Sequence, residues 1–389
     1  MKLYTLRDLL QIKNGKDHKH LANGDIPIFG SGGVMRFGDK AIYENDSILL
    51  PRKGTLSNIQ FVSKPFWTVD TLYYTVVNTK LANPFYLYNL LKTLDLSSLN
   101  SGTGVPSMTF DAYYDLKISL PDINTQSEIA SVLSALDAKI ELNNSINAEL
   151  EAMAKTIYDY WFVQFDFPDK NGLPYKSNGG KMVWNEELKR KVPEEWEVCK
   201  IEKFAMFKNG KGLHDSLFEK DGRYNIFGSN GIVGKTNQPL FNDPVIAIGR
   251  VGANYGEINY SLQPSWISDN AVTCQPIKKE YLWWLILSLR GINYKAIAGG
   301  SAQPLITQGK LREIKFIVPN DLIFVKYHRL IDSLYLQVEN NNLQCLKLAE
   351  LRDWLLPMLM NGQVSVGKAY EQVEEVLGMV AEDGEGYEK

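Results

Sequence analysis

The chain has 389 residues, enough for two or three domains that each bury a core of their own. Hydrophobic residues make up 44% and charged residues 22%, as in ordinary globular proteins, and no run of about 18 apolar residues predicts a membrane span. The first residues lack the apolar core of a signal peptide. Three scattered cysteines, Cys199, Cys274 and Cys345, form no CxxC pair and suit a reducing compartment. We therefore expect a cytoplasmic protein, neither membrane-spanning nor stabilised by a disulfide framework.

The net charge of −3 is distributed unevenly along the chain. Residues 1–121 carry 13 Lys and Arg against 10 Asp and Glu, and residues 196–319 carry 15 against 10. The stretch 122–165 and the tail 363–389 each carry 2 against 7. Phosphate binding needs local positive potential rather than a basic whole protein. The two basic blocks are therefore compatible with DNA binding, although chance variation explains them equally well.

In chain order, residues 1–121 come first and mix short β-rich runs, such as 46–50, with Gly and Asn turns. A helical run at 84–92 lies within the same stretch, after the β-rich runs. This pattern predicts a compact mixed α/β domain. Residues 124–162 contain neither Gly nor Pro, and their apolar residues have helical spacing. This stretch predicts one long helix.

The same succession returns after a polar linker at 166–195. Residues 196–319 again contain β-rich runs, such as 244–248, and a helical run at 280–290. Residues 322–361 predict a second long helix with one late proline, Pro357. The acidic tail is expected to be part helix and part disordered.

The two halves repeat each other at a spacing close to 198 residues. Lys13-Asn14-Gly15-Lys16 recurs as Lys208-Asn209-Gly210-Lys211, and the run at 28–34 recurs at 226–232. A repeat of this length predicts a duplicated structural unit. Further pairs in the same order are Ile48 and Ile246, Arg52 and Arg250, Trp67 and Trp266, Asp70 and Asp269, Gly102 and Gly300, Pro106 and Pro304, Thr109 and Thr307, Lys117 and Lys315, and Pro121 and Pro319.

Both predicted long helices carry a seven-residue repeat of the coiled-coil kind, with a polar middle. One seam position holds Ile129, Leu136, Asn143, Leu150 and Ile157 in the first helix, and Tyr327, Leu334, Asn341, Leu348 and Leu355 in the second. The adjoining position holds Val132, Lys139, Ile146, Met153 and Tyr160, and Leu330, Gln337, Gln344, Leu351 and Met358.

We therefore expect an α+β fold: two pseudo-repeated mixed α/β domains, each followed by a long helix, with the helices paired as an antiparallel coiled coil. A helix packed only on its own domain is the alternative, which a length of roughly 58 Å for 39 residues disfavours. Equivalent residues of antiparallel helices meet only at the middle. We hypothesise that Asn143 and Asn341 face each other there and fix the register.

This geometry suggests bipartite recognition. Because DNA rises about 3.4 Å per base pair, such a helix pair spans very roughly 17 base pairs. Each domain could read a few base pairs and leave unread DNA between them, as half-site spacing follows dimer geometry elsewhere. The two domains differ in sequence, which predicts two different half-sites.

Several runs closely resemble Type I restriction–modification specificity subunits. The first extends from Leu120 to Glu141 and includes Gln126-Ser127-Glu128-Ile129-Ala130, and it continues in Tyr158-Asp159-Tyr160-Trp161-Phe162 through to Pro168. Residues 179–185 and 192–196 resemble the family's central linker. The resemblance covers essentially the whole chain in the family's order. The second helix departs from the pattern at 324–326 (Phe-Val-Lys) and 340–342 (Asn-Asn-Asn).

The resemblance implies a non-catalytic DNA-binding subunit that holds two methyltransferase subunits and restriction subunits. S-adenosylmethionine would bind the methyltransferase partner, and ATP and Mg²⁺ would bind the restriction partner. No cofactor or metal would bind this chain. The implied regions are target recognition domains at 1–121 and 196–319, spacer helices at 122–165 and 320–362, a central linker at 166–195 and an acidic tail at 363–389.

Other chemical patterns are incomplete. Residues 228–236 end in Gly-Lys-Thr, but a Ser stands where a phosphate-binding loop needs its first Gly. Asp169 with Glu187-Leu188-Lys189 matches a loose nuclease pattern, within the polar linker. The adenine methyltransferase signature Asn/Asp-Pro-Pro-Tyr/Phe is absent. His18 and His20 lack the Cys or acidic partners typical of a metal site.

Basic residues in the turn-rich segments are the best DNA candidates, because Arg reads guanine bidentately and Lys more often contacts phosphate. Arg52 and Arg250 share a repeat position, which favours a shared positioning role over base reading. Trp67 and Trp266 are expected in the core. Residues that read bases should differ between the halves, as Asn254, Tyr255 and Gln263 differ from Thr55, Leu56 and Phe66. The predicted DNA-binding set is Lys13, Lys16, Ser31, Arg36, Arg52, Lys53, Lys208, Lys211, Ser229, Lys235, Arg250 and Asn254, each of which also fits a solvated surface position.

Two other functions remain open from the sequence. One is a coiled-coil adaptor without sequence-specific DNA binding, which would be indifferent to DNA even with its partner bound. The other is a metal-dependent nuclease acting through the linker carboxylates, which would cleave DNA with Mg²⁺ and no partner.

Overall fold

The computed structural model describes the backbone of residues 1–53, 57–96, 107–299 and 304–385, with side chains up to residue 376. The chain divides into two compact units. Unit 1 comprises residues 1–145 and 340–389, and unit 2 comprises residues 146–339. Among the described helices, none combines the length and apolar character needed to cross a bilayer.

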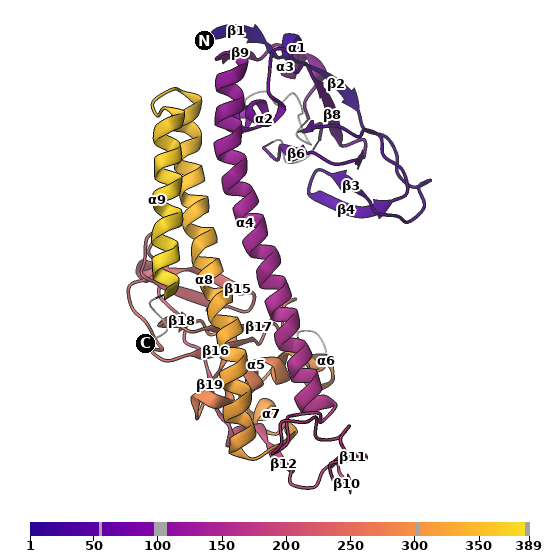
Figure 1. The fold of residues 1–389 in the computed structure, drawn as a ribbon, viewed down its shortest axis with the longest axis vertical. Coiled ribbons are helices and arrows are strands. Elements are labelled where there is room, and N and C mark those ends of the chain that lie inside the picture. The colour runs from indigo at the N-terminus through magenta and orange to yellow at the C-terminus, as the bar shows by residue number, and fades with distance from the viewer. Residues whose placement is uncertain (54–56, 97–106, 300–303, 386–389) are drawn as a thin grey trace. The chain divides into compact units, whose positions relative to one another are not determined.

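The described part of unit 1 contains three small sheets (Figure 1). In the first, β2 (Leu10–Asn14), β8 (Leu72–Val77), β5 (Ser47–Pro51) and β6 (Gln60–Val62) lie in that order and pair antiparallel. In the second, β3 (Ile26–Gly30) pairs antiparallel with β4 (Gly33–Gly38) and parallel with β7 (Trp67–Thr68). β1 (Lys2–Thr5) pairs with β9 (Lys117–Leu120), and the short helices are α1 (Leu6–Leu9), α2 (Pro84–Lys92) and α3 (Phe110–Tyr114).

Unit 2 repeats this arrangement strand for strand. β13 (Ala205–Asn209), β19 (Ala271–Pro276), β16 (Val245–Gly249) and β17 (Ile258–Ser261) form the first sheet, and β15 (Gly231–Thr236), β14 (Tyr224–Gly228) and β18 (Ser265–Ile267) the second. β12 (Glu197–Lys200) pairs with β20 (Lys315–Val318). The α-helices are α5 (Leu282–Arg290), α6 (Tyr294–Ile297) and α7 (Gln308–Arg312), with 3-10 turns at Ile201–Lys203, Asp215–Leu217 and Lys279–Tyr281. A hairpin of β10 (Met182–Asn185) and β11 (Arg190–Pro193) lies in the linker.

Small features repeat as well as the strands. The register of β3–β4 shifts after Ile28, and that of β14–β15 shifts after Ile226, 198 residues later. Thr109 and Thr307 cap the equivalent helices α3 and α7 by accepting a backbone hydrogen bond. The predicted duplication is confirmed. Of the repeat pairs predicted from the sequence, Gly102, Pro106 and Gly300 lie outside the described residues.

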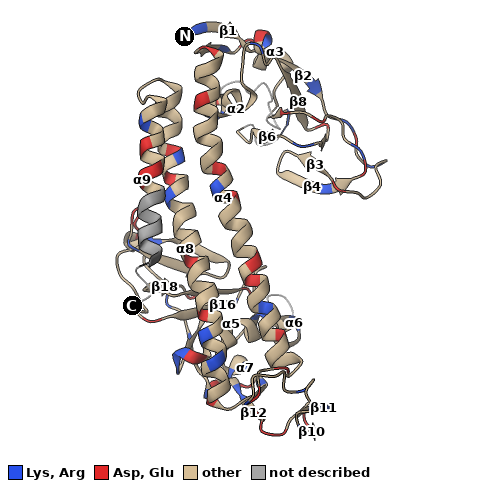
Figure 2. Ribbon diagram, in the orientation of Figure 1, with Lys and Arg blue, Asp and Glu red and all other residues tan. Residues whose placement is uncertain are grey.

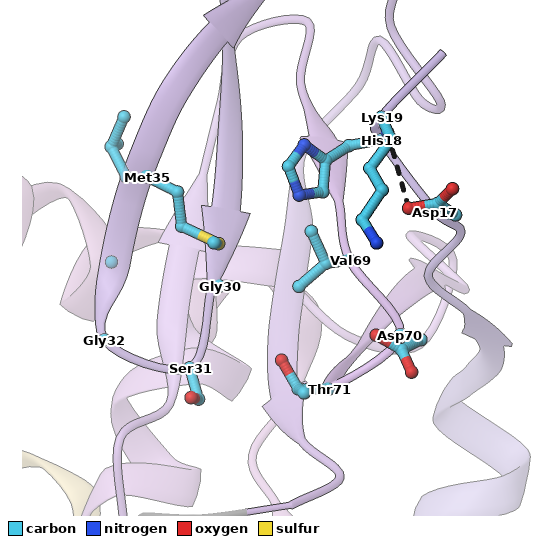
Figure 3. Close-up of a pocket in the computed structure, with 12 residues that line it drawn as sticks. Asp17, His18, Lys19, Gly30, Ser31, Gly32, Met35, Val69, Asp70 and Thr71 are labelled. Atoms are coloured by element: carbon cyan, nitrogen blue, oxygen red, sulfur yellow. Dashed lines mark hydrogen bonds between the residues drawn. The ribbon is translucent and has the colours of Figure 1, made fainter. Parts of the chain in front are cut away.

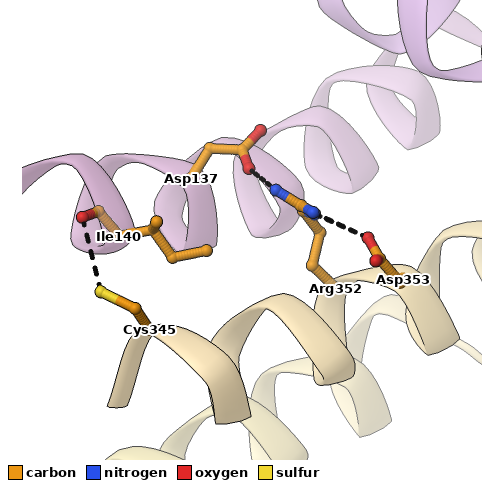
Figure 4. Close-up of polar contacts among 5 residues, drawn as sticks. All are labelled: Asp137, Ile140, Cys345, Arg352 and Asp353. Atoms are coloured by element: carbon orange, nitrogen blue, oxygen red, sulfur yellow. Dashed lines mark hydrogen bonds and ion pairs between the residues drawn. The ribbon is translucent and has the colours of Figure 1, made fainter. Parts of the chain in front are cut away.

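The two long helices are α4 (Ile123–Tyr158) and α8 (Asp321–Met360), and they pack antiparallel within each unit, as predicted. In unit 1, Asn143 donates to Gln344 at 2.9 Å, and Asp137, farther toward the start of α4, pairs with Arg352, farther along α8, at 2.7 Å (Figure 4). In unit 2, Trp161, just beyond α4, lies 5.6 Å from Tyr327 between ring centroids.

The predicted helix seam is partly wrong. Met153, Tyr160 and Leu330 were assigned to it and are exposed, at 52%, 49% and 43%. A straight helix drifts by about 20° per heptad from an exact seven-residue repeat, so the apolar stripe moves to neighbouring residues such as the buried Ala154. A π-helical turn at Asp159–Val163 adds a further shift near Tyr160.

Of the remaining predicted seam residues, Gln337 is exposed as well, and the others are buried or half-buried. Asn143 and Asn341 are buried, which agrees with a polar middle of the seam. The recorded acceptor of the Asn143 amide is Gln344, one helical turn beyond Asn341. Leu136 and Leu348 are buried, whereas Leu150 and Leu334 are half-buried.

The acidic tail contains a helix that packs on unit 1. α9 (Val366–Glu385) runs beside the last part of α8 (Figure 1). Ala369 and Val373 are buried in the same hydrophobic core as Leu355 and Leu359 of α8. Tyr370 donates to the Ser131 hydroxyl of α4 at 3.2 Å. The tail thus adds a third helix to the α4–α8 pair in unit 1.

Candidate nucleic-acid interface

Each unit has a β-hairpin next to a loop that carries basic residues. In unit 1 the β3–β4 hairpin and the loop at 17–19 line one cleft of about 790 Å³, together with residues 69–71 (Figure 3). Met35, His18 and Lys19 extend toward the same space in Figure 3. The cleft is open and carries both signs of charge, since Asp17 and Asp70 also line it. Its form suits an extended polar ligand better than a small enclosed one.

A repeated hydrogen bond fixes the basic loop. The indole Nε1 of Trp67 donates to the Lys16 carbonyl at 2.9 Å, and that of Trp266 donates to the Lys211 carbonyl at 2.7 Å. Both tryptophans are buried, as predicted. The lysine side chains themselves remain exposed, so they can reach an external anion.

Each of these lysines directly follows a glycine that is packed tightly against the backbone of a neighbouring segment. A Cβ on Gly15 would collide with the carbonyl oxygen of Val69, and one on Gly210 would collide with that of Ser268. Glycine is therefore needed at both positions to bring the loop against the strand. Lys13 and Lys208, two residues before these glycines, are exposed on the edge strands β2 and β13.

Arg36 is engaged within its own unit. Its guanidinium donates to His18 Nδ1 at 3.1 Å, to the His18 carbonyl, and to the Leu21 carbonyl at 3.1 Å. These bonds tie β4 to the loop at 18–21 and occupy most of the donor capacity of Arg36. They favour a structural role for Arg36, and a contact of Arg36 with DNA stays a prediction.

Arg52 and Arg250 join the same three segments in their units. The Arg52 amide donates to the Thr71 carbonyl, and the Arg52 carbonyl accepts from Met108. Arg250 makes the equivalent pair with Asn270 and Ile306. The two arginines therefore hold equivalent backbone positions, and a shared role of their side chains in positioning DNA stays a prediction.

The two guanidinium groups nevertheless differ. Arg52 donates to the Asp70 carbonyl at 3.3 Å and lies 5.9 Å from the ring centroid of Tyr73. Burial raises the pKa of Tyr73 despite this nearby positive charge. Arg250 Nε is buried and has no hydrogen-bond partner among the described residues. An external acceptor at Arg250 would therefore remove a cost of desolvation.

The other predicted DNA-binding residues are either half-buried or exposed. Ser31 and Ser229 are the half-buried turn residues of the two hairpins, and the Ser31 carbonyl accepts from Asn58. Lys53, Lys235 and Asn254 are exposed. Figure 2 shows Lys or Arg on β2 and β4 and mostly Asp and Glu on α4, in line with the charge pattern of the sequence.

Among the residues compared between the halves, Phe66 is fully buried and belongs to the core of unit 1. It cannot contact a base without unfolding its surroundings. Gln263 is exposed and Tyr255 half-buried, whereas Thr55 and Leu56 lie outside the described residues.

The sequence did not predict one feature, a pair of exposed aliphatic residues at each hairpin. These are Val34 and Met35 on β4, and Ile232 and Val233 on β15. Their positions match across the repeat, but apolar residues in a strand ordinarily indicate a buried face. They are exposed here because β4 and β15 lie at the edges of their sheets.

The alternative chemical patterns do not form sites. Residues 228–236 form a strand, a turn and a strand, not the loop and helix of a phosphate-binding motif. In the linker, Asp169 Oδ1 accepts from the Asn171 and Leu173 amides, and Glu187 pairs with Lys315. No group of three or more potential metal ligands occurs within the described part of the chain.

The cysteines are not paired with each other. Cys199 and Cys274 are buried, and burial strongly raises the pKa of the Cys274 thiol. Cys345 lies in unit 1, where its sulfur faces the Ile140 carbonyl across the helix pair at 3.7 Å (Figure 4). Their surroundings fit packing roles.

Comparison with known proteins agrees with the fold and the repeat. The model of the Type I restriction modification DNA specificity domain matches residues 1–152 and again residues 193–346. The Type I restriction enzyme MjaIX specificity subunit of Methanocaldococcus jannaschii is 23% identical, over 90% of this chain and 86% of its own length. The HindI specificity subunit of Haemophilus influenzae is 25% identical, over 74% of this chain and 79% of its own length.

A solved structure shares the architecture. The S subunit of the Type I restriction–modification system of M. genitalium superposes with a TM-score of 0.65, at 18% identity, covering 92% of this chain and 95% of that one. At this identity the similarity shows the fold. Because the family model matches both halves of the chain, the chain belongs to the family of Type I restriction–modification DNA specificity subunits.

Proposed function

We propose that this chain binds double-stranded DNA at an asymmetric, bipartite site, with residues 1–121 reading one half and residues 196–319 reading the other. The observation that carries the proposal is that one candidate surface occurs twice with different exposed side chains. Phe37 of β4, for example, corresponds to Lys235 of β15. A duplicated framework with divergent surface residues suits two different half-sites on one duplex.

The spacer helices would set the length of the unread DNA. α4 has 36 residues and α8 has 40, so each is about 54 to 60 Å long. Buried polar contacts such as that of Asn143 with Gln344 support a single fixed register. A fixed register would give one gap length rather than a range.

The chain would also hold catalytic partners. Leu142, Leu343 and Leu346 lie on the spacer helices of unit 1 and are 52%, 53% and 62% exposed. A contiguous exposed apolar patch is typical of a surface that another protein covers, and three exposed leucines on the helices of one unit could contribute to such a patch. We expect two methyltransferase subunits there and restriction subunits in the larger complex. S-adenosylmethionine would belong to the methyltransferase and ATP with Mg²⁺ to the restriction subunit, with no cofactor bound by this chain.

Single-molecule sequencing of genomic DNA tests the proposal. The DNA comes from cells that express this chain with its methyltransferase subunit. We expect methylated adenines in one split motif with an unread gap. A folded complex that leaves no new methylation would overturn sequence-specific recognition and favour the adaptor function.

The spacing can be tested separately. Inserting one heptad at matched positions of α4 and α8 lengthens each helix by about 10.5 Å, or about 3 base pairs of DNA. We expect the same half-sites with a longer gap. An unchanged gap would contradict the role of the helices as a ruler.

A further inference from the structure

The two hairpins carry the same unusual pattern of exposure. From the first residue of each strand, β4 and β15 have identical sequences of half-buried, exposed, exposed, half-buried, exposed and buried positions. Val34 and Met35 are 50% and 58% exposed, and Ile232 and Val233 are 58% and 56% exposed. These pairs follow directly after the turn in both units.

The exposed pair lies at a β-bulge in both units. Phe29 pairs with Val34 and Ile28 with Arg36, which makes Met35 the extra residue of β4, and Val233 is the extra residue of β15 in the same way. A bulge re-aims side chains away from the strict alternation of a strand. β4 and β15 are also edge strands, because each pairs only with its hairpin partner. β3 and β14 pair on their other side with β7 and β18 as far as Phe29 and Phe227, and beyond those pairs the turn end of each hairpin is a two-stranded ribbon.

Glycines shape both ribbon ends in the same way. Gly33 and Gly231 adopt φ of +114° and +93°, which the tight turns require. A Cβ on Gly30 would lie 2.5 Å from Met35 Sδ, and a Cβ on Gly228 would lie 2.8 Å from Val233 Cγ1. The absence of side chains there lets Met35 and Val233 lie across the ribbon.

Exposed lysines near each ribbon favour a polyanion as its occupant. In unit 1, Lys19 lines the cleft beside Met35 together with Asp17 and Asp70, and the exposed Lys16 precedes this loop. In unit 2, Lys235 is exposed two residues after Val233 on the same strand. An apolar end flanked by exposed cations matches a DNA groove, where base edges lie between two rows of phosphates. The major groove, about 12 Å wide, admits a two-stranded β-ribbon.

We propose that the β3–β4 and β14–β15 hairpins each enter the major groove of one half-site, where Val34 with Met35, and Ile232 with Val233, contact thymine methyl groups. The inference rests on the proposed function and adds a specificity-determining element to it. Thymine is the only base that presents a methyl group in the major groove. An aliphatic side chain there discriminates by contact with that methyl, without a hydrogen bond. The two pairs differ in shape, so the two half-sites would place thymine differently.

Uracil substitution provides the test, because it removes only the thymine methyl group. The split motif from methylation sequencing is synthesised with single thymines replaced by uracil, and the complex with its methyltransferase subunit is titrated against each duplex. Loss of one buried methyl weakens binding by about fourfold. We expect at least one such position in each half-site.

Variants then assign each methyl to a hairpin. Val34→Asn with Met35→Gln should abolish the uracil effect in one half-site and leave it intact in the other. Ile232→Asn with Val233→Asn should do the reverse. Asparagine and glutamine present no methyl group, and all four positions are exposed, so the hairpin is expected to fold; the intact effect at the second half-site verifies folding. Leu3→Asn is the matched control and should leave both uracil effects unchanged, since Leu3 is 66% exposed on β1.

Each outcome decides the inference. Uracil effects that are absent from the half-sites, or that persist in the hairpin variants, would overturn it while bipartite recognition stands. Loss of partner binding in the variants, with DNA binding intact, would show that the hairpins face a protein. Failure to find any split motif would reject the proposed function and the inference together.

Discussion

Asn143 and Gln344 connect the two spacer helices inside unit 1, with 2.9 Å between the Asn143 amide nitrogen and Gln344 Oε1. Asn143 is 1% exposed, so its amide has almost no access to water. A buried amide that loses its partner bears the full cost of desolvation. This contact therefore links stability to one register of the helix pair.

Asn143→Ala should lower the free energy of unfolding by about 1 to 3 kcal/mol, because the buried Asn143 side chain is removed and the half-buried Gln344 loses its donor. Urea denaturation followed by circular dichroism measures the change. The double variant Asn143→Leu with Gln344→Leu is the control and should recover much of the loss, since neither polar partner remains. A single variant as stable as the wild type would show that the bond adds nothing.

Asn143→Leu with Asn341→Leu tests the polar middle of the seam. Two leucines satisfy several registers of a coiled coil, whereas buried amides favour one. We expect altered association or a broadened hydrodynamic size, measured by size-exclusion chromatography with light scattering. A single sharp species with unchanged mass would count against register control by these residues.

Gly15→Ala and Gly210→Ala should each destabilise their unit by about 1 to 3 kcal/mol, because the added Cβ collides with a backbone carbonyl that cannot rotate away. Thermal unfolding measures the loss. Gly32→Ala is the matched control, since a Cβ there meets nothing within 4 Å, and its melting temperature should stay unchanged. Equal effects at the three glycines would disprove the steric cause.

Arg36→Gln should reduce stability rather than change base preference. The substitution removes the bonds to His18 Nδ1 and to the His18 and Leu21 carbonyls, at a cost of about 1 to 3 kcal/mol. The readouts are the melting temperature and the methylated motif. The exposed Lys13→Gln serves as the comparison and should change stability by under about 0.5 kcal/mol. A new motif from a stable Arg36 variant would show that Arg36 contacts bases.

Lys16→Gln and Lys211→Gln should weaken DNA binding at all sequences alike. Each phosphate contact adds about 0.9 to the slope of log affinity against log salt, so each variant should lower that slope by about this amount. Fluorescence anisotropy across a salt series measures it. Lys368→Gln in α9 is the control, because that exposed lysine lies outside both recognition domains. Equal slopes for the three variants would place the phosphate contacts elsewhere.

Several features could be read from the sequence because they depend on local pattern. The long helices follow from apolar spacing over some forty residues without internal glycine. The duplication follows from the repeat, which also aligns Arg52 with Arg250 at equivalent backbone positions. Trp67 and Trp266 were expected in the core and are buried there, where each indole removes a large apolar area from water.

Only the tertiary structure decided which of those residues are available to a ligand. Arg36 is held by a loop some 18 residues away, and no local pattern shows such a contact. Val34 and Met35 resemble core residues in sequence, but the free edge of the hairpin exposes them. The register at Tyr160 depends on one π-helical turn, and the docking of α9 depends on a core shared with α8. Local pattern determines where elements form, whereas exposure and donor availability depend on contacts between residues distant in the chain.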